Sequence, residues 1–327
     1  MAMSKLQLKE LVRRVVVAQG NTFIKDLLRD NGTRIGVTKD DFSNNLNAAI
    51  DEDVITQAKL EAWLAEVEGW GDQHLYLFQA PETDAPALAA GIAASPHARA
   101  LDAGVSLDFP EGLDLKQISL GRPGLSMEWH QSKEGWNRWT PRDYVVEEGL
   151  QRFRFDAYRQ RFDRSVVRFE WDFTQPYCAI LIHRNPDIDH AVVFTQVTEA
   201  LWAIGCPAVS LVQISFSQAV KVAARDDHGV HSTRYELDSG YVEMASTLAE
   251  GGIESVAAVR GVLHAVDASQ FTRAQGMLHF APEDHGTTRR IPVQVYGSEG
   301  RLRIGAQCKR EDVFKVVETL WDYNNQP

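Results

Sequence analysis

The sequence has few cysteines, no long apolar run and none of the compact motifs that mark a catalytic site. Only three cysteines occur in 327 residues, Cys178, Cys206 and Cys308, and they lie far apart. An odd, scattered set of thiols in a chain of this length indicates a reducing compartment rather than a disulfide framework. No run approaches the roughly 20 apolar residues of a membrane helix, and Met1–Gln19 lacks the features of a secretory signal. A cytoplasmic protein without membrane contact is therefore predicted.

Several motifs that usually carry chemistry are missing as well. There is no Gly-x-Ser-x-Gly elbow of an esterase-like enzyme, no Walker loop for nucleotide phosphates and no internal repeat. The histidines lack the i, i+4 helical spacing of a metalloprotease, and no cysteine pair accompanies them. The sequence therefore predicts no cofactor and no metal site of a recognised type.

The charge balance is acidic, with 45 Asp and Glu against 34 Lys and Arg, a net charge of −11. Such a chain repels polyanions as a whole, so binding to nucleic acid requires a local basic patch.

An order of strand, helix and strand is predicted between residues 177 and 216. Tyr177–His183 is an almost unbroken apolar run, the pattern of a strand covered on both faces. A helix follows from about Asp189 to Ile204, and Gly205 and Pro207 end it. Ala208–Phe216 then predicts a second strand, which would complete a right-handed β-α-β crossover if the two strands are parallel. The first turn is not glycine-rich, so the phosphate-binding form of this unit is absent.

The first 70 residues or so show the periodicity of four short helices. Thr38 and Asp41 have the spacing of a capping box at the start of the third helix. The fourth helix ends near Gly69. The apolar residues expected to face inward from the first three helices are Leu8, Leu11, Val12, Val15, Phe23, Ile24, Leu27, Leu28, Phe42, Leu46, Ala49 and Ile50.

A pair of helices joined by a glycine-containing turn resembles the helix-turn-helix and the small DNA-binding modules of the SAP type. The helix that begins at Thr38 sets Lys39 against Asp40 and Asp41, which is poor chemistry for facing phosphates. Residues 1–35 carry seven Lys and Arg against three acids, so a basic face would belong to the first two helices. A module that binds a protein partner through the N-terminal helices is the preferred interpretation, with DNA binding as the alternative.

Composition changes at Pro81–Gly112, where Ala, Pro and Gly dominate and at most one short helix is expected. The predicted organisation is a helical interaction domain (1–80), a linker (81–112) and an α+β domain (113–327). The fold class is α+β, with a small helical bundle followed by a larger mixed sheet. The further predicted elements are strands at Ser255–Val266, Met277–Phe280, Ile291–Tyr296 and Leu302–Gly305, a turn at Tyr296–Arg301 and a final helix at Glu311–Tyr323.

Three tryptophans, Trp129, Trp136 and Trp139, surround Lys133–Gly135, and a hairpin that turns at this tripeptide is predicted. Cross-strand aromatic packing is the preferred role for them. The alternative is that exposed Trp136 and Trp139 stack on bases or sugars.

The most unusual composition lies in residues 151–168. Arg152 and Arg154 alternate with Phe153 and Phe155, which indicates a strand with a basic face. In an acidic protein this is the best candidate for contact with an anionic partner, nucleic acid included. The alternative is pairing within the chain, because residues 138–172 hold seven acids against eight arginines. The predicted binding residues are Arg152, Arg154, Arg159, Arg161, Arg164, Arg168, Trp136 and Trp139.

Overall, a non-enzymatic adaptor subunit of a larger cytoplasmic assembly is predicted. The alternative is a metal-dependent hydrolase or nuclease in the α+β domain. Its ligands would come from the loop that holds Asp226, Asp227, His228 and His231, or from a strand whose one face carries Arg168, Glu170 and Asp172.

Overall fold

The computed structural model describes residues 3–121, 124–183, 188–206, 212–225, 230–237, 240–245, 256–266 and 273–326. The chain forms two compact units, each assembled from separate stretches of sequence. The first comprises Met1–Leu60, Val105–Asp114 and Trp129–Ser165, and the second comprises Glu61–Gly104, Leu115–Glu128 and Val166–Pro327. The division into a helical domain (1–80), a linker (81–112) and an α+β domain (113–327) stays a prediction.

The N-terminal helices are confirmed. They are α1 (Lys5–Arg14), α2 (Asn21–Asp30), α3 (Lys39–Asp51) and α4 (Gln57–Val67), with the 3-10 helix η1 (Val16–Ala18) between α1 and α2. Ser4 and Thr38 each begin a helix with a reciprocal capping box, which satisfies backbone amides that have no partner inside the helix. The twelve apolar side chains predicted to face inward from α1, α2 and α3 are all buried.

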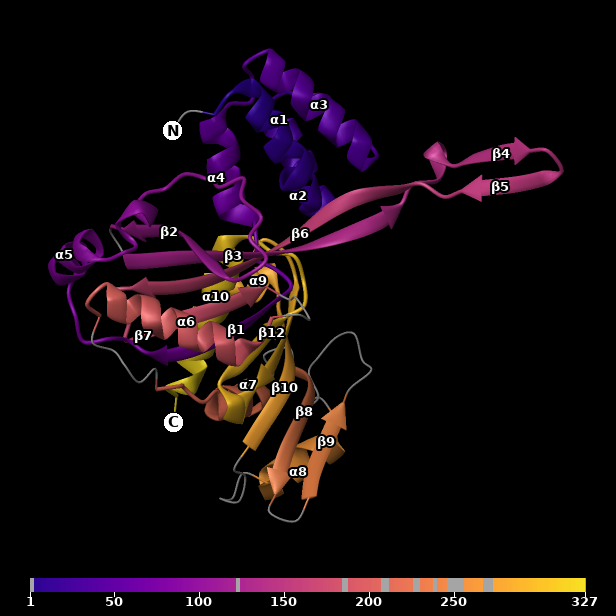
Figure 1. The fold of residues 1–327 in the computed structure, drawn as a ribbon. Coiled ribbons are helices and arrows are strands. Elements are labelled where there is room, and N and C mark those ends of the chain that lie inside the picture. Colours follow the sequence, from indigo (N-terminus) through magenta and orange to yellow (C-terminus); the bar gives the residue numbers. More distant parts are fainter. Residues whose placement is uncertain are drawn as a thin grey trace. The chain divides into compact units, whose positions relative to one another are not determined.

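A sheet of ten strands dominates the described part of the chain, in the order β2-β3-β6-β7-β1-β12-β11-β10-β8-β9 (Figure 1). The registered pairs, such as β1 with β7 and β11 with β12, are antiparallel. The α+β class is therefore confirmed. The strands are β1 (Gln73–Gln79), β2 (Asp114–Leu120), β3 (Gly124–Arg138), β6 (Tyr158–Asp172), β7 (Tyr177–His183), β8 (Val230–Leu237), β9 (Gly240–Ala245), β10 (Arg273–Phe280), β11 (Ile291–Tyr296) and β12 (Arg301–Ile304).

The central strands β1 and β7 are covered on both faces, as the apolar run of β7 predicts. On one face the rings of Tyr76 and Phe78 contact Phe194 of helix α6 (His190–Ala203), at centroid distances of 4.9 and 5.8 Å. On the other face Leu75 and Leu181 join a core with helices α7 (Ser217–Arg225) and α10 (Arg310–Asn324). Figure 1 shows α6 and α10 on opposite sides of these strands. Among the helices that the structure describes, none is long and apolar enough to cross a membrane.

The Ala-rich stretch after β1 forms α5 (Ala85–Ala94), which Asp84 caps, and the 3-10 helix η2 (Ala98–Ala100). Gly91 lets α5 approach the end of α6 closely, because a Cβ atom at this position would collide with the carbonyl oxygen of Ile204. The expected single short helix is present, and its packing requires glycine at one site.

The strand predicted at Ala208–Phe216 is wrong in the part that the structure describes, although the segment has the direction expected for the crossover, because it and β7 both run antiparallel to β1. Residues 207–211 lie outside the described ranges, and residues 212–216 form no strand. Gln213 makes one isolated antiparallel bridge to Phe78, and the backbone amide of Ile214 donates to the Leu77 carbonyl at 2.9 Å. This segment lies beside β1, whose other edge is already paired with β7, and it continues directly into α7.

The predicted strand at Ser255–Val266 is also wrong, because Ala257–Val266 forms helix α8. Valine favours strands, but an apolar run of this length does not by itself distinguish a strand from a buried helix. The hairpin β11–β12 and the final helix α10 are confirmed, and Val313, Val316, Val317 and Leu320 of α10 are buried. The remaining short elements are α9 (Pro282–His285) and η5 (Gly297–Glu299).

The predicted hairpin at Lys133–Gly135 is wrong as well. Strand β3 runs straight through this tripeptide, and Gly135 is not among the glycines with positive φ. The chain reverses later, at Gly149, whose φ of 63° suits a turn. There a separate two-stranded sheet forms from β4 (Tyr144–Glu148) and β5 (Gln151–Phe155).

Candidate functional site

The candidate site is the two-stranded sheet of β4 and β5, residues 144–155, called here the ribbon (Figure 1). Its register pairs Tyr144 with Phe155, Val146 with Phe153, and Glu147 with Arg152. Gly149 and Leu150 form the connection, and Leu150 is fully exposed at the tip. Because side chains alternate along a strand, the ribbon has two faces of different chemistry.

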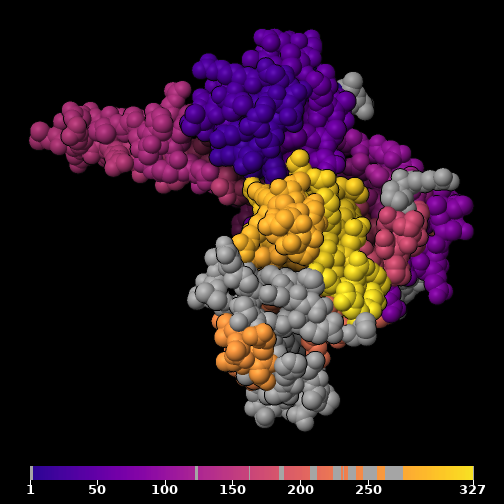
Figure 2. All heavy atoms as spheres, turned by 180° about the vertical axis from the view of Figure 1, so that it is seen from behind, coloured from indigo at the N-terminus to yellow at the C-terminus, as the bar shows by residue number. Residues whose placement is uncertain are grey.

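One face of the ribbon is aromatic. Tyr144 and Phe155 lie opposite each other, with nearly parallel rings (14°) and centroids 4.9 Å apart. Val146 and Phe153 form the next pair on this face. Tyr144, Phe153 and Phe155 are 57%, 41% and 46% exposed, so stacking shields these rings only partly from water. In the space-filling view the ribbon belongs to the magenta part of the surface (Figure 2).

The other face carries Arg152 and Arg154, and both guanidinium groups are paired within the ribbon or beside it. Arg152 lies 3.2 Å from Glu147, its direct cross-strand neighbour. Arg154 lies 3.0 Å from Asp156. All four side chains are largely exposed, so these pairs are weak and can rearrange when another charged group approaches.

Asp143 holds the base of the ribbon together. Its carboxylate accepts two hydrogen bonds from the Arg138 guanidinium, one of them at 2.7 Å, and a third at 2.9 Å from the backbone amide of Ala157. The hydrogen bond from Arg138, and after it that from Ala157, lowers the pKa of Asp143 to about 2. The short 3-10 helix η3 (Thr140–Arg142) leads into this junction.

The three tryptophans have different surroundings. Trp129 is buried, in agreement with a packing role, whereas Trp136 and Trp139 are 61% and 40% exposed. The guanidinium carbons of Arg142 and Arg159 lie 5.6 and 5.9 Å from the centroid of the Trp139 ring, within cation–π range.

The structure brings most of the predicted arginines to the same unit as the ribbon, but not Arg168. Arg159 lies 3.9 Å from Asp40, and Arg161 donates to Asp163 at 2.9 Å. Arg164 donates to the Ser106 carbonyl at 2.8 Å. Arg168 belongs to the second unit and is only 5% exposed, so its guanidinium is not part of an accessible surface. Each of the six predicted arginines thus has a partner within the chain.

The residues of the enzyme alternative are mostly outside the described ranges. Residues 226–229, which include Asp226, Asp227 and His228, lie outside the described residues, as does the side chain of His231. Within the described ranges, no group of three or more His, Cys, Asp or Glu side chains is placed to hold a metal ion. The alternative stays a prediction.

No protein-family model, curated protein or solved structure matches the chain. The residues themselves must therefore indicate the function.

The sequence analysis missed the aromatic residues Tyr144 and Phe155 as members of one surface. The signal was present, since Tyr-Val-Val-Glu-Glu and Gln-Arg-Phe-Arg-Phe flank Gly149-Leu150. Two alternating runs separated by two residues, one of them glycine, predict a hairpin. The prediction placed the turn at Lys133–Gly135 instead, between the tryptophans.

Proposed function

We propose that this protein is a non-enzymatic interaction subunit of a cytoplasmic assembly, and that the ribbon docks onto a partner protein through its aromatic face. The observation that carries the proposal is the exposed aromatic pair Tyr144 and Phe155 with Phe153 beside it. Aromatic side chains are enriched at the centres of protein interfaces, because they bury a large area for a small loss of conformational entropy.

The ribbon is suited to binding rather than to folding alone. A two-stranded hairpin by itself is at most marginally stable in water. Its exposed rings can therefore gain further burial by contact with a partner. Each strand also has one edge without a strand partner, because the sheet contains only β4 and β5 among the described residues. Free edges allow a partner strand to add by backbone hydrogen bonds while the rings fill apolar pockets.

Charge supports a protein partner over a polyanion. The guanidinium groups of Arg152 and Arg154 already neutralise carboxylates of Glu147 and Asp156. A nucleic acid would have to displace these acids and would meet a nearly balanced surface. The arginine face is therefore proposed to orient the partner through exchange of exposed ion pairs, which affects association rate and salt dependence more than affinity.

The N-terminal helices remain the second proposed contact with a protein partner. Their apolar faces are used inside the bundle, and the large apolar side chains left exposed in residues 3–60 are Leu6, Ile35 and Val37. This small area makes them secondary to the ribbon in the proposal.

The test begins with tagged protein recovered from its native host at low salt, followed by identification of bound proteins and nucleic acids. The recovered partner is then titrated against the wild type and two variants of the ribbon. Phe153→Ser with Phe155→Ser removes rings from the aromatic face, and Arg152→Gln with Arg154→Gln alters the opposite face on the same strand.

We expect the serine variant to weaken partner binding by about 30-fold or more, the size of an interface hot spot. The glutamine variant should weaken it only a few-fold, about what exposed ion pairs contribute. Undiminished binding by the serine variant would refute the aromatic contact. Recovery of a nucleic acid whose binding is abolished by Arg152→Glu, Arg154→Glu and Arg161→Glu would instead support the anionic partner.

A further inference from the structure

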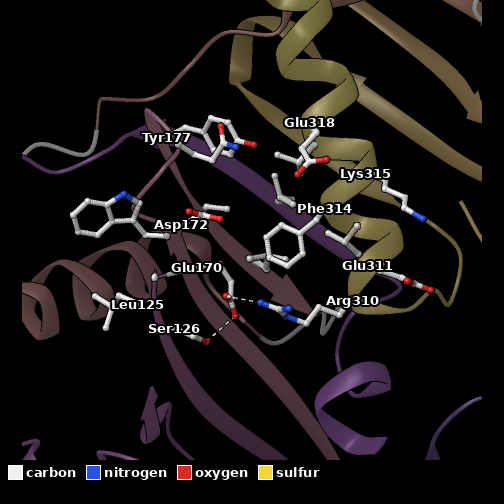
Figure 3. Close-up of a pocket in the computed structure, with 18 of the residues that line it drawn as sticks. Leu125, Ser126, Glu170, Asp172, Tyr177, Arg310, Glu311, Phe314, Lys315 and Glu318 are labelled. Atoms are coloured by element: carbon white, nitrogen blue, oxygen red, sulfur yellow. Dashed lines mark hydrogen bonds and ion pairs between the residues drawn. The ribbon is translucent and has the colours of Figure 1, made fainter. Parts of the chain in front are cut away.

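A pocket of about 540 Å³ lies in the second unit, between the sheet and helix α10 (Figure 3). Strands β2, β3, β6, β7 and β1 supply one side, and residues between Arg310 and Glu318 of α10 supply the other. Its volume is in the range of sites for small organic ligands. It is separate from the ribbon, and no part of the proposed interaction uses it.

The interior of the pocket is apolar. Leu75, Ala179 and Leu181 line it from the sheet, and Val313, Phe314 and Val317 line it from α10. The Phe314 ring is directed toward the open space in Figure 3. Such a lining binds the hydrocarbon or aromatic body of a ligand by removing it from water.

A buried carboxylate lies at one end of this apolar space. Glu170 is 8% exposed, and its carboxylate accepts a hydrogen bond of 2.7 Å from the Ser126 hydroxyl. The Arg310 guanidinium lies 3.9 Å away, a loose ion pair that leaves Glu170 incompletely compensated. Burial raises the pKa of Glu170, and the Ser126 hydroxyl and the guanidinium groups of Arg310 and Arg168 oppose this shift.

Two further carboxylates line the pocket. Glu318 points toward the open space, whereas Lys315 and Glu311 point away from it (Figure 3). The Asp172 carboxylate accepts hydrogen bonds from the backbone amide and the hydroxyl of Thr174, at 2.8 and 2.7 Å. Burial first, and then the carboxylates of Glu318, Asp322 and Asp172, raise the pKa of Tyr177, another lining residue. The Arg310 guanidinium is held over the Phe314 ring at 4.8 Å, beside Glu170. The pocket thus combines an apolar wall with an excess of negative charge.

We propose that this pocket binds a small organic cation, a protonated amine that carries an aliphatic or aromatic body. The ammonium group lies among the carboxylates of Glu170, Asp172 and Glu318, and the body packs on Phe314 and the leucines. A carboxylate ligand of the same size would be repelled by Glu170, Asp172 and Glu318, which outnumber the one guanidinium group among the lining residues, that of Arg310. A neutral ligand would leave Glu170 as poorly compensated as before. Charge complementarity therefore selects the amine.

Three probes of similar size and shape test the sign of the charge: 2-phenylethylammonium, 3-phenylpropanoate and 2-phenylethanol. Each is titrated into the full-length protein by calorimetry at pH 7.5. We expect the ammonium probe to bind at least about tenfold more tightly than either of the others, the effect of a single well-placed charge pair. Equal affinity for the three probes would overturn the proposal, and so would lack of binding of the ammonium probe at about 10 mM.

Matched variants on one helix locate the site. Glu318→Gln should weaken binding of the ammonium probe about fivefold or more. Glu311→Gln, the same change on a side chain that points away, should leave it unchanged. Glu170→Gln should have the larger effect, and because Gln keeps the size of Glu, circular dichroism will show whether the fold is retained. Unchanged affinity in Glu318→Gln and in folded Glu170→Gln, or an equal loss in Glu311→Gln, would overturn the assignment.

Discussion

Strand β6 passes from the first compact unit into the second, and its two halves place arginine in opposite surroundings. Arg161 pairs with Asp163, and both side chains are 53% exposed. Seven residues later Arg168 pairs with Glu128 at 2.6 Å, and these side chains are only 6% and 18% exposed. Arg168 also donates to the Glu68 carbonyl at 2.7 Å and lies 4.7 Å from the centre of the Trp70 ring.

The difference teaches that one residue type serves two purposes along one strand. An exposed ion pair contributes little to stability, because water already solvates both charges and salt screens them. A buried pair must hold its geometry, because removal of one partner leaves an unsolvated charge. The same contrast applies to phenylalanine, which is partly exposed at Phe153 and Phe155 on the ribbon and buried at Phe169 in the sheet. Three experiments can break or sharpen this comparison.

The largest effect is expected from a core phenylalanine. Phe169 on β6 is completely buried and lies opposite Ile180 of β7. Phe169→Ala should lower the free energy of unfolding by about 4 kcal/mol, from lost apolar burial and the cavity that remains. Phe153→Ala on the ribbon should lower it by less than about 1 kcal/mol, because that ring is exposed. Urea titration of both variants measures the two values, and similar losses would contradict the comparison.

A smaller effect is expected from the arginines. Arg168→Ala leaves the Glu128 carboxylate without this partner in a largely dry site, so the free energy of unfolding should fall by about 3 kcal/mol. Arg161→Ala removes only an exposed pair and should change it by less than about 0.5 kcal/mol. Urea titration measures both values. Equal losses in Arg168→Ala and Arg161→Ala would show that the buried pair contributes no more than the exposed one.

The smallest effect is local and depends on pH. The pKa of Asp143 is lowered to about 2, so the stability it contributes to the ribbon's base is present above its ordinary value near 3.8. That contribution should be lost as the pH falls from about 4 toward 2, when the carboxylate is protonated and releases Arg138 and the Ala157 amide. Amide hydrogen exchange at Ala157 and Trp139 reports the loss.

Two variants separate this effect from general acid unfolding. Asp143→Asn should speed exchange at Ala157 already at pH 6, while the central sheet stays protected. Asp163→Asn, at an exposed pair on β6, should not. Equal exchange at Ala157 in both variants would show that Asp143 does not hold the ribbon.

Elements set by local chemistry were predictable. The capping box at Thr38 and Asp41, the apolar run of β7 and the glycine turn between β11 and β12 each contain their structural reason within a few residues. The turn at Lys133–Gly135 failed because β3 is held in extended form by neighbouring strands on the sheet, which no local pattern reveals. Helix α8 failed because valine-rich apolar runs suit both states.

The candidate site was predictable in composition and not in arrangement. The alternation of arginine and phenylalanine placed them correctly on opposite faces of a strand. The partner of each arginine was not predictable, because Asp40 and Ser106 approach Arg159 and Arg164 from distant parts of the sequence.

By itself the sequence determined the helical N-terminus, the α+β class and the two-faced chemistry of residues 151–155, since all three follow from periodicity and local capping. Only the tertiary structure decided which charged residues face water and which face the core. Arg161 and Arg168 lie on one strand, and it is the packing of Trp70, Glu68 and Glu128 around the second that buries it. Burial depends on what other segments bring to a side chain, and that is a property of the whole fold.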